Sequence, residues 1–214
     1  LELPVGQFEL RNAYRETPWL PLDFQLQAQP KPTLLGAVLA LQSVEQGWRA
    51  SVRATWQTGD HPLDFAFFDL PVTVRDSIDT SKLAAQLVPH GDSSRVTLRL
   101  LPPLPEAGLT TVEFSFQLPN NSSTQAVSIP QVSVVADPPL RPILALPEQL
   151  GGQAIQWTQT GRRLDDVPDN LLATYLRKSY LFYELEASQS QVGWKRFEDA
   201  PKDARLLLSR ATLL

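Results

Sequence analysis

The sequence contains no cysteine and no methionine, and only 2 of its 214 residues are histidine. Without cysteine, disulfide bonds, thiolate catalysis and thiolate metal sites are all excluded. Apolar runs such as residues 33–41 are far shorter than the roughly 20 residues that a membrane-spanning helix needs. Acidic and basic residues nearly balance, at 23 and 19, and neither sign forms a block. The charge therefore favours neither nucleic acid nor an anionic membrane as a partner.

Common catalytic motifs are also missing: there is no G-x-S-x-G, H-E-x-x-H, P-loop or G-x-G-x-x-G pattern. His90, Asp92 and Ser93 contain the residue types of a hydrolase triad, but they are too close in sequence to adopt its geometry. We interpret this stretch, HGDSS, as a polar loop before a strand at residue 95. A metal site shared by His61 and His90 would need at least one further ligand. We therefore expect no enzyme activity, no catalytic or metal-binding residue and no cofactor.

The dominant pattern is the alternation of apolar and polar residues, which places successive side chains on opposite faces of a β-strand. It predicts half-buried strands at residues 23–29, 94–101 and 110–118. Residues 34–44 are apolar on both faces, as in a central strand, and lead through Gln46 and Gly47 into a predicted hairpin. These strands indicate antiparallel sheets.

Two stretches lose the alternation partway. In residues 63–74 the parity changes between Phe67 and Phe68, which predicts a bulge or a bend. In residues 125–136 it slips around Pro130, a residue tolerated in a strand only at an edge or a bulge. Such slips are typical of a strand that passes from one sheet to another.

The segment WRASVRATW, residues 48–56, combines two tryptophans with two arginines, as a sugar or nucleic-acid platform would. Alternation places Trp48 and Trp56 on one face and Arg49 and Arg53 on the other. The rings and the cations therefore cannot form one joint platform. We expect the tryptophans to lie in the core and the arginines to pair with acidic neighbours on a solvated face.

Helical patterns are sparse. Residues 79–87 could form a short helix capped by Thr80 or Ser81. Residues 166–180 could form another, with Pro168 in its first turn and an apolar face, although an aromatic-rich strand is the alternative for its second half.

The spacing of about seven strands over residues 23–136 predicts an antiparallel β-sandwich of immunoglobulin-like size. A stiff connector with three prolines, residues 137–142, follows it. We therefore predict a mainly β fold with a sandwich domain at 1–137 and a smaller β-rich region at 138–214, which contains the better helix candidate and could continue beyond the chain given.

An acidic cluster, Asp165, Asp166 and Asp169, offers the oxygen ligands that calcium prefers. It lacks the alternating spacing and the glycine of a calcium loop. Helix capping by Asp166 and a favourable interaction of Asp169 with the helix dipole explain the cluster better than calcium binding does. Whether the cluster binds calcium stays an open question.

These observations favour a non-catalytic structural or interaction module. The chain starts without an initiator methionine and ends on an apolar, strand-like run without a polar tail, which suggests a piece of a larger, exported protein found outside the cytoplasm. The partner would be a protein or a glycan, and the sequence does not predict the oligomeric state.

One alternative is a carbohydrate-binding module that stacks sugars on Trp19 and Trp194, the tryptophans least explained by a core. A hydrolase with carboxylates far apart in the chain is a third possibility, although no pair stands out.

Overall fold

The computed structural model describes residues 31–45, 47–59, 62–81, 83–119, 125–158, 160–185 and 190–196. These residues form a mainly β fold with three sheets, and their helical segments are three short 3-10 turns. The strand predicted at 23–29 lies outside the described residues. Within the described ranges, no helix has the length and apolar composition that crossing a membrane requires.

The largest sheet has six strands in the order β12-β13-β9-β1-β2-β6. In that order, they span Arg162–Leu164, Tyr180–Glu184, Ile143–Pro147, Thr33–Val44, Gly47–Gln57 and Leu109–Gln117. β1 and β2 form the predicted hairpin. Neighbours are antiparallel except β1 and β9, which run parallel. This parallel pair departs from the predicted antiparallel pattern, and it is possible because a long crossover connects the two strands.

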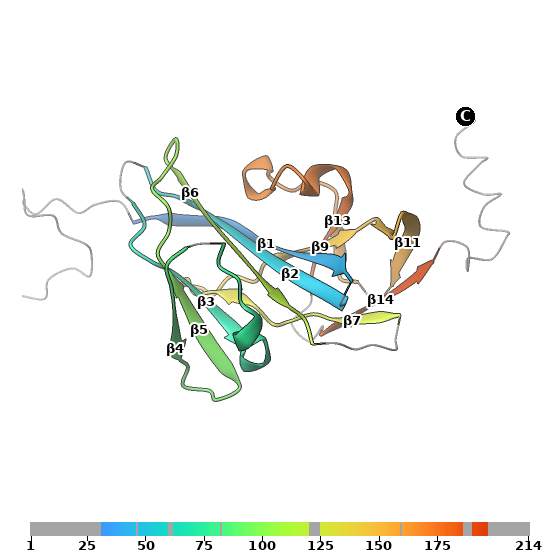
Figure 1. Ribbon diagram of the computed structural model, residues 1–214. Coiled ribbons are helices and arrows are strands. Elements are labelled where there is room, and N and C mark those ends of the chain that lie inside the picture. The colour runs from blue at the N-terminus through green and yellow to red at the C-terminus, as the bar shows by residue number, and fades with distance from the viewer. Residues whose placement is uncertain are drawn as a thin grey trace, which may run out of the picture.

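The two smaller sheets have four strands each. One has the order β4-β5-β3-β8, with strands Ala85–Pro89, Arg95–Leu100, Ala66–Pro71 and Ser133–Val134. The other has the order β10-β11-β14-β7, with strands Gln149–Leu150, Gln153–Thr158, Gln191–Arg196 and Ala126–Ser128. Figure 1 shows β3, β4 and β5 below one end of the long strands β1, β2 and β6, and β7, β11 and β14 near their other end.

Aromatic contacts join the large sheet to both smaller ones. Phe68 of β3 packs against Phe114 of β6, with ring centroids 4.8 Å apart, and against Trp56 of β2 at 6.2 Å. At the other end, Trp48 of β2 meets Trp157 of β11 at 5.8 Å. The predicted sandwich is therefore confirmed, with one long sheet facing two short ones across a shared core.

The segment at residues 48–56 follows its predicted alternation. Trp56 is only 6% exposed and Trp48 packs, half-buried, against the main core. On the opposite face Arg53 pairs with Glu113, as expected for an arginine beside an acidic neighbour. Thr55 differs, because it is buried on the outer face although its position is polar.

The two irregular stretches have different outcomes. The predicted bulge between Phe67 and Phe68 is wrong, because β3 keeps a continuous register with β5. Phe67 lies on the face of β3 that points away from the core, with its ring centroid 6.3 Å from that of Phe65. Because Phe67 is apolar although it points outwards, the sequence pattern looks like a change of parity. The slip at Pro130 is confirmed as a sheet change, since β7 before it and β8 after it belong to different sheets.

Both predicted helices are wrong. Residues 85–87 of the first, predicted at 79–87, belong to strand β4, because pairing with β5 outweighs the local helical preference. In the second, two 3-10 turns, η2 (Asp169–Leu171) and η3 (Leu176–Lys178), lead into strand β13. A third 3-10 turn, η1 (Val72–Ser77), follows β3.

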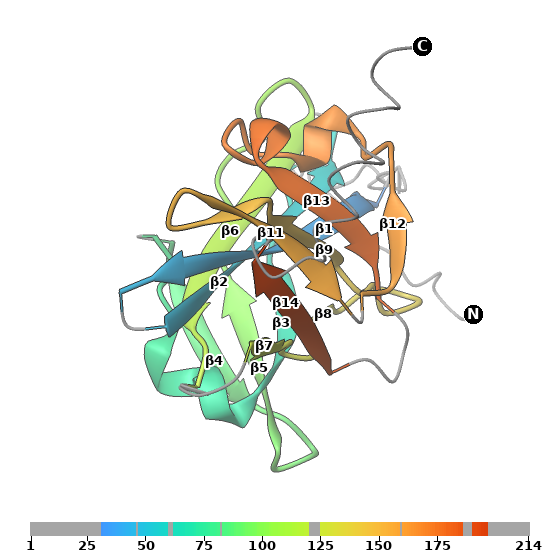
Figure 2. The same cartoon turned by 90° about the vertical axis from the view of Figure 1, so that its right-hand side faces the viewer.

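The segment with η2 and η3 covers the outer face of the large sheet, on the side away from the small sheets (Figures 1 and 2). A second apolar cluster forms there from Val38, Ala40, Ala145, Leu171, Ala173 and Leu176. This cover explains why residues 34–44 are apolar on both faces, as predicted for a central strand. Gly36 allows the close approach, because a Cβ at that position would lie 2.6 Å from Leu171 Cδ1.

Strands from both sides of the predicted boundary at residues 137 and 138 share the large sheet. β9 pairs with β1 over Val38 to Ala40, and Leu144 and Leu146 lie in the main core. The division of the chain at residues 137 and 138 stays a prediction.

Candidate functional site

Two neighbouring strands place polar side chains on the outer face of the large sheet. In the register of β2 and β6, Arg53 stands opposite Glu113 and Thr55 opposite Thr111. Alternate residues of β2 point into the core, so these side chains point away from it. Arg53 Nη1 lies 3.1 Å from Glu113 Oε2, and the two threonine hydroxyls are 3.2 Å apart.

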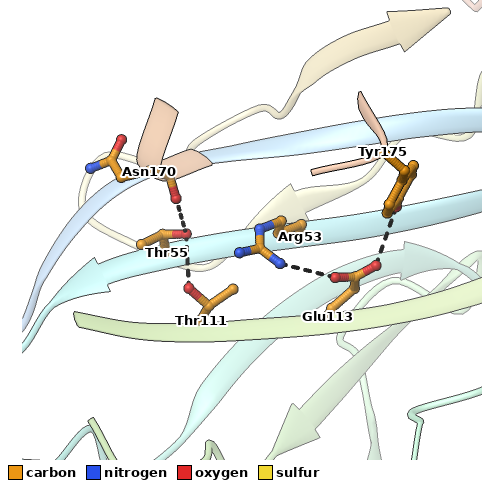
Figure 3. Close-up of polar contacts among 6 residues, drawn as sticks. All are labelled: Arg53, Thr55, Thr111, Glu113, Asn170 and Tyr175. Carbon is orange, nitrogen blue, oxygen red and sulfur yellow. Dashed lines mark hydrogen bonds and ion pairs between the residues drawn. The ribbon is translucent and has the colours of Figure 1, made fainter. Parts of the chain in front are cut away.

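The segment with η2 and η3 lies over this polar row (Figure 3). The Tyr175 phenol donates to Glu113 Oε1 at 3.3 Å, and the Thr55 hydroxyl donates to the Asn170 carbonyl oxygen at 3.3 Å. Glu113 therefore receives a guanidinium on one oxygen and a phenol on the other. We call Arg53, Glu113 and Tyr175 the Tyr175 site.

The Tyr175 phenol holds its proton more tightly than an ordinary tyrosine. Partial burial raises its pKa to about 12, and the negative charge of Glu113 adds to the increase. The phenol is a hydrogen-bond donor at neutral pH, as any tyrosine is, and the raised pKa extends this to alkaline pH. Arg53 Nε is buried without a hydrogen-bond partner in the described part of the chain, so the Arg53 side chain is both ion-paired and partly desolvated.

A cavity of about 300 Å³ lies near β3, β5 and the loop between β7 and β8. Its charged lining residues are Asp69, Arg95 and Arg141. Asp69 Oδ1 accepts a hydrogen bond from Thr97 at 2.7 Å, and Arg95 donates to the Gln131 carbonyl oxygen at 3.2 Å. None of the described residues that line this cavity is aromatic, whereas the Tyr175 ring is 44% exposed, so the Tyr175 site is the stronger candidate for recognition.

The HGDSS stretch is the predicted polar loop, and β5 begins at Arg95 directly after it. His90 Nδ1 accepts a hydrogen bond from the Asp92 backbone N–H at 3.0 Å, so Nε2 carries the proton of the neutral ring. That nitrogen lies 3.8 Å from Asp69 Oδ2. Hydrogen bonds from Ser94 lower the pKa of Asp92, and its carboxylate bonds to Ser94 instead of completing a triad with Ser93. His61 lies outside the described residues.

The predicted stacking residues do not come together in the described structure. Trp194 lies in β14 opposite Trp157 and packs, half-buried, against the main core. Trp19 lies outside the described residues. A stacking role for either stays a prediction.

The acidic cluster is divided between two ion pairs. Asp165 lies 3.7 Å from Arg163, and Asp169 lies 3.7 Å from Arg177. The predicted capping by Asp166 is wrong, because Pro168 is the N-cap of η2 and no side chain caps that turn. In the described ranges, no group of three or more His, Asp or Glu side chains could hold a metal ion.

Comparison with protein-family models, curated proteins and solved structures finds no match for this chain.

The sequence did not predict the Tyr175 site. Alternation places Arg53 and Glu113 on solvated faces, but 60 residues separate them, and only the register of β2 and β6 makes them partners. The helical pattern of residues 166–180 places Tyr175 on one apolar face with Leu171, Leu172 and Leu176, whereas Tyr175 is 44% exposed. A signal was present in its position between Leu171 and Leu176, two buried residues that fix it over the sheet.

Proposed function

We propose that this chain is a non-catalytic interaction module that binds a partner protein at the Tyr175 site. The observation that carries the proposal is the Tyr175 ring, 44% exposed and fixed over an ion pair. Tyrosine and arginine are enriched among the residues that dominate binding energy in protein interfaces. Arg53 and Glu113 lie on strands, so a rigid scaffold presents their charges.

The site is also preorganised. Leu171 and Leu176 are buried on both sides of Tyr175, and Thr55 bonds to the backbone of Asn170. Binding therefore orders few additional side chains, which reduces the entropy lost on association.

Carbohydrate binding through Trp19 and Trp194 is the alternative suggested by the sequence. Half-burial of Trp194 reduces the ring area left for a sugar. The rest of the proposal, that the module belongs to a larger, exported protein, rests on the sequence alone.

The test first cross-links the full chain to the proteins that bind it. Each partner found in this way is then purified and titrated into the full chain. Tyr175→Ala is expected to weaken binding about tenfold, the loss typical of an interface anchor. Arg162→Ala serves as the control, because it removes an exposed arginine that pairs with Glu184, away from the Tyr175 site.

Three results would count against the proposal. If Tyr175→Ala and Arg53→Ala each bind the partner as tightly as the unchanged chain does, the Tyr175 site is not part of the interface. Polysaccharide binding that is lost in Trp194→Ala would favour the carbohydrate alternative. Hydrolysis of a glycoside or ester that Glu113→Gln abolishes would make the chain an enzyme.

A further inference from the structure

The loop between β5 and β6 contains the sequence LPPLP at residues 101–105. Proline fixes φ near the polyproline II value, and a residue that precedes proline is restricted to extended or polyproline II backbone. Three of these five residues are proline, and Leu101 and Leu104 each precede one. The segment is therefore strongly biased towards a polyproline II conformation before any partner binds.

Hydrogen bonds hold both ends of this segment. The Leu101 N–H donates to the Ala84 carbonyl oxygen at 2.9 Å. Beyond Pro105, Glu106 and Leu109 exchange backbone hydrogen bonds of 2.8 and 3.0 Å, closing a turn in which Ala107 and Gly108 have positive φ. Residues 101–105 thus bridge two fixed points, which limits the entropy that a bound partner would remove.

Exposure along the segment has a period of three residues, the repeat of a polyproline II helix. Pro102 and Pro105 are half-buried, whereas Leu101 and Leu104 are 50% and 83% exposed. Pro103 is exposed as well. The segment therefore rests on the molecule along one edge and presents two leucines along another.

A simple connector between strands explains the prolines but not these leucines. Connecting loops usually place polar residues in water. Leu104 has the highest exposure among the exposed large hydrophobic side chains of the described residues. Burial against a partner would remove this apolar area from water.

We propose that residues 101–105 are a docking segment for a partner protein with an aromatic-lined groove that receives polyproline II backbone. Tyrosine and tryptophan rings in such grooves pack on proline and leucine side chains, and their O–H and N–H groups donate to backbone carbonyl oxygens of the bound segment. The exposed Glu106 directly follows it, so a basic residue at the rim of the groove would complement its charge. Arg99 is not available for such contacts, because its guanidinium lies 3.5 Å above the Phe65 ring.

The test titrates the full chain into isotope-labelled WW and SH3 domains and follows the amide shifts of their groove residues. We expect saturable binding to at least one domain and about tenfold weaker binding for Leu104→Ser, which removes one buried leucine from the interface. Val135→Ser is the matched control, because Val135 is also exposed, at 48%, but lies in another segment. Thermal unfolding of each variant confirms that it is folded.

Absence of binding to every domain, or equal affinity of Leu104→Ser and the unchanged chain, would overturn the proposal. Concentration-dependent dimerisation that Leu104→Ser abolishes would also overturn it, since a second copy would then be the occupant. The docking segment does not depend on the Tyr175 site, and the two are measured with different ligands, so either can fail alone.

Discussion

The indole of Trp157 donates a hydrogen bond to the Pro147 carbonyl oxygen at 2.7 Å, and both residues are buried. The same ring meets Trp48 edge to face. One side chain of β11 thus satisfies a polar group at the end of β9 and packs against β2. This arrangement connects a small sheet to the large one through both polar and apolar contacts.

Trp157→Phe is expected to lower the free energy of unfolding by about 2 kcal/mol, because the Pro147 carbonyl loses its donor while still buried. Urea unfolding followed by circular dichroism measures the change. Trp194→Phe is the control, since Trp194 is half-buried, and we expect a smaller loss. Equal losses in the two variants would show that the hydrogen bond adds little.

Gly161→Ala is expected to destabilise the pairing of β12 with β13. A Cβ at residue 161 would overlap the backbone carbonyl oxygen of Glu184, which cannot move without breaking the sheet edge. We expect a loss of about 1–3 kcal/mol, the range for overpacking. Gly91→Ala is the control, because nothing lies within 4 Å of its added methyl group. Urea midpoints compare the two, and an unchanged Gly161→Ala midpoint would contradict the close contact.

The sequence predicts local geometry better than long-range pairing. Alternation depends only on neighbouring residues, so it assigned Trp56 to the core and Arg53 to the outer face correctly. The helix expected at 166–180 fails because its leucines bury against Val38 and Ala40 of a distant strand, which two short turns achieve without a full helix.

The candidate site could not be predicted for the same reason. Arg53, Glu113 and Tyr175 come from three separate segments, and their meeting depends on the register of β2 with β6 and on the cover that η2 and η3 form. A single sequence gives no register between distant strands. Alternation alone identifies which residues face outwards, not which of them are neighbours.

The Tyr175 phenol is expected to titrate with a pKa of about 12, above its ordinary value of 10. Below pH 10 the folded and unfolded states both keep the proton, so the phenol's contribution to stability is fully present. As the pH rises from 10 towards 12, the unfolded state ionises first and stability falls.

Ultraviolet absorbance of tyrosinate, compared between the unchanged chain and Tyr175→Phe, isolates this titration. Glu113→Gln should lower the pKa of Tyr175, because it removes a negative charge beside the phenol. The same variant should change stability at neutral pH by less than about 1 kcal/mol, as is usual for a partly exposed ion pair. An unshifted pKa in Glu113→Gln would argue against the contact between the two side chains.

A chain that ends at residue 137 is expected not to unfold as a cooperative unit. It would lack β9, which pairs with β1, and the core residues Leu144 and Leu146. It would also lack Leu171 and Leu176, leaving apolar side chains of β1 exposed on the outer face. Burial of both faces is what the apolar pattern of a central strand requires. Urea unfolding of this fragment and of the full chain, followed by tryptophan fluorescence, compares them, and a sharp transition in the fragment would support the division of the chain at residues 137 and 138.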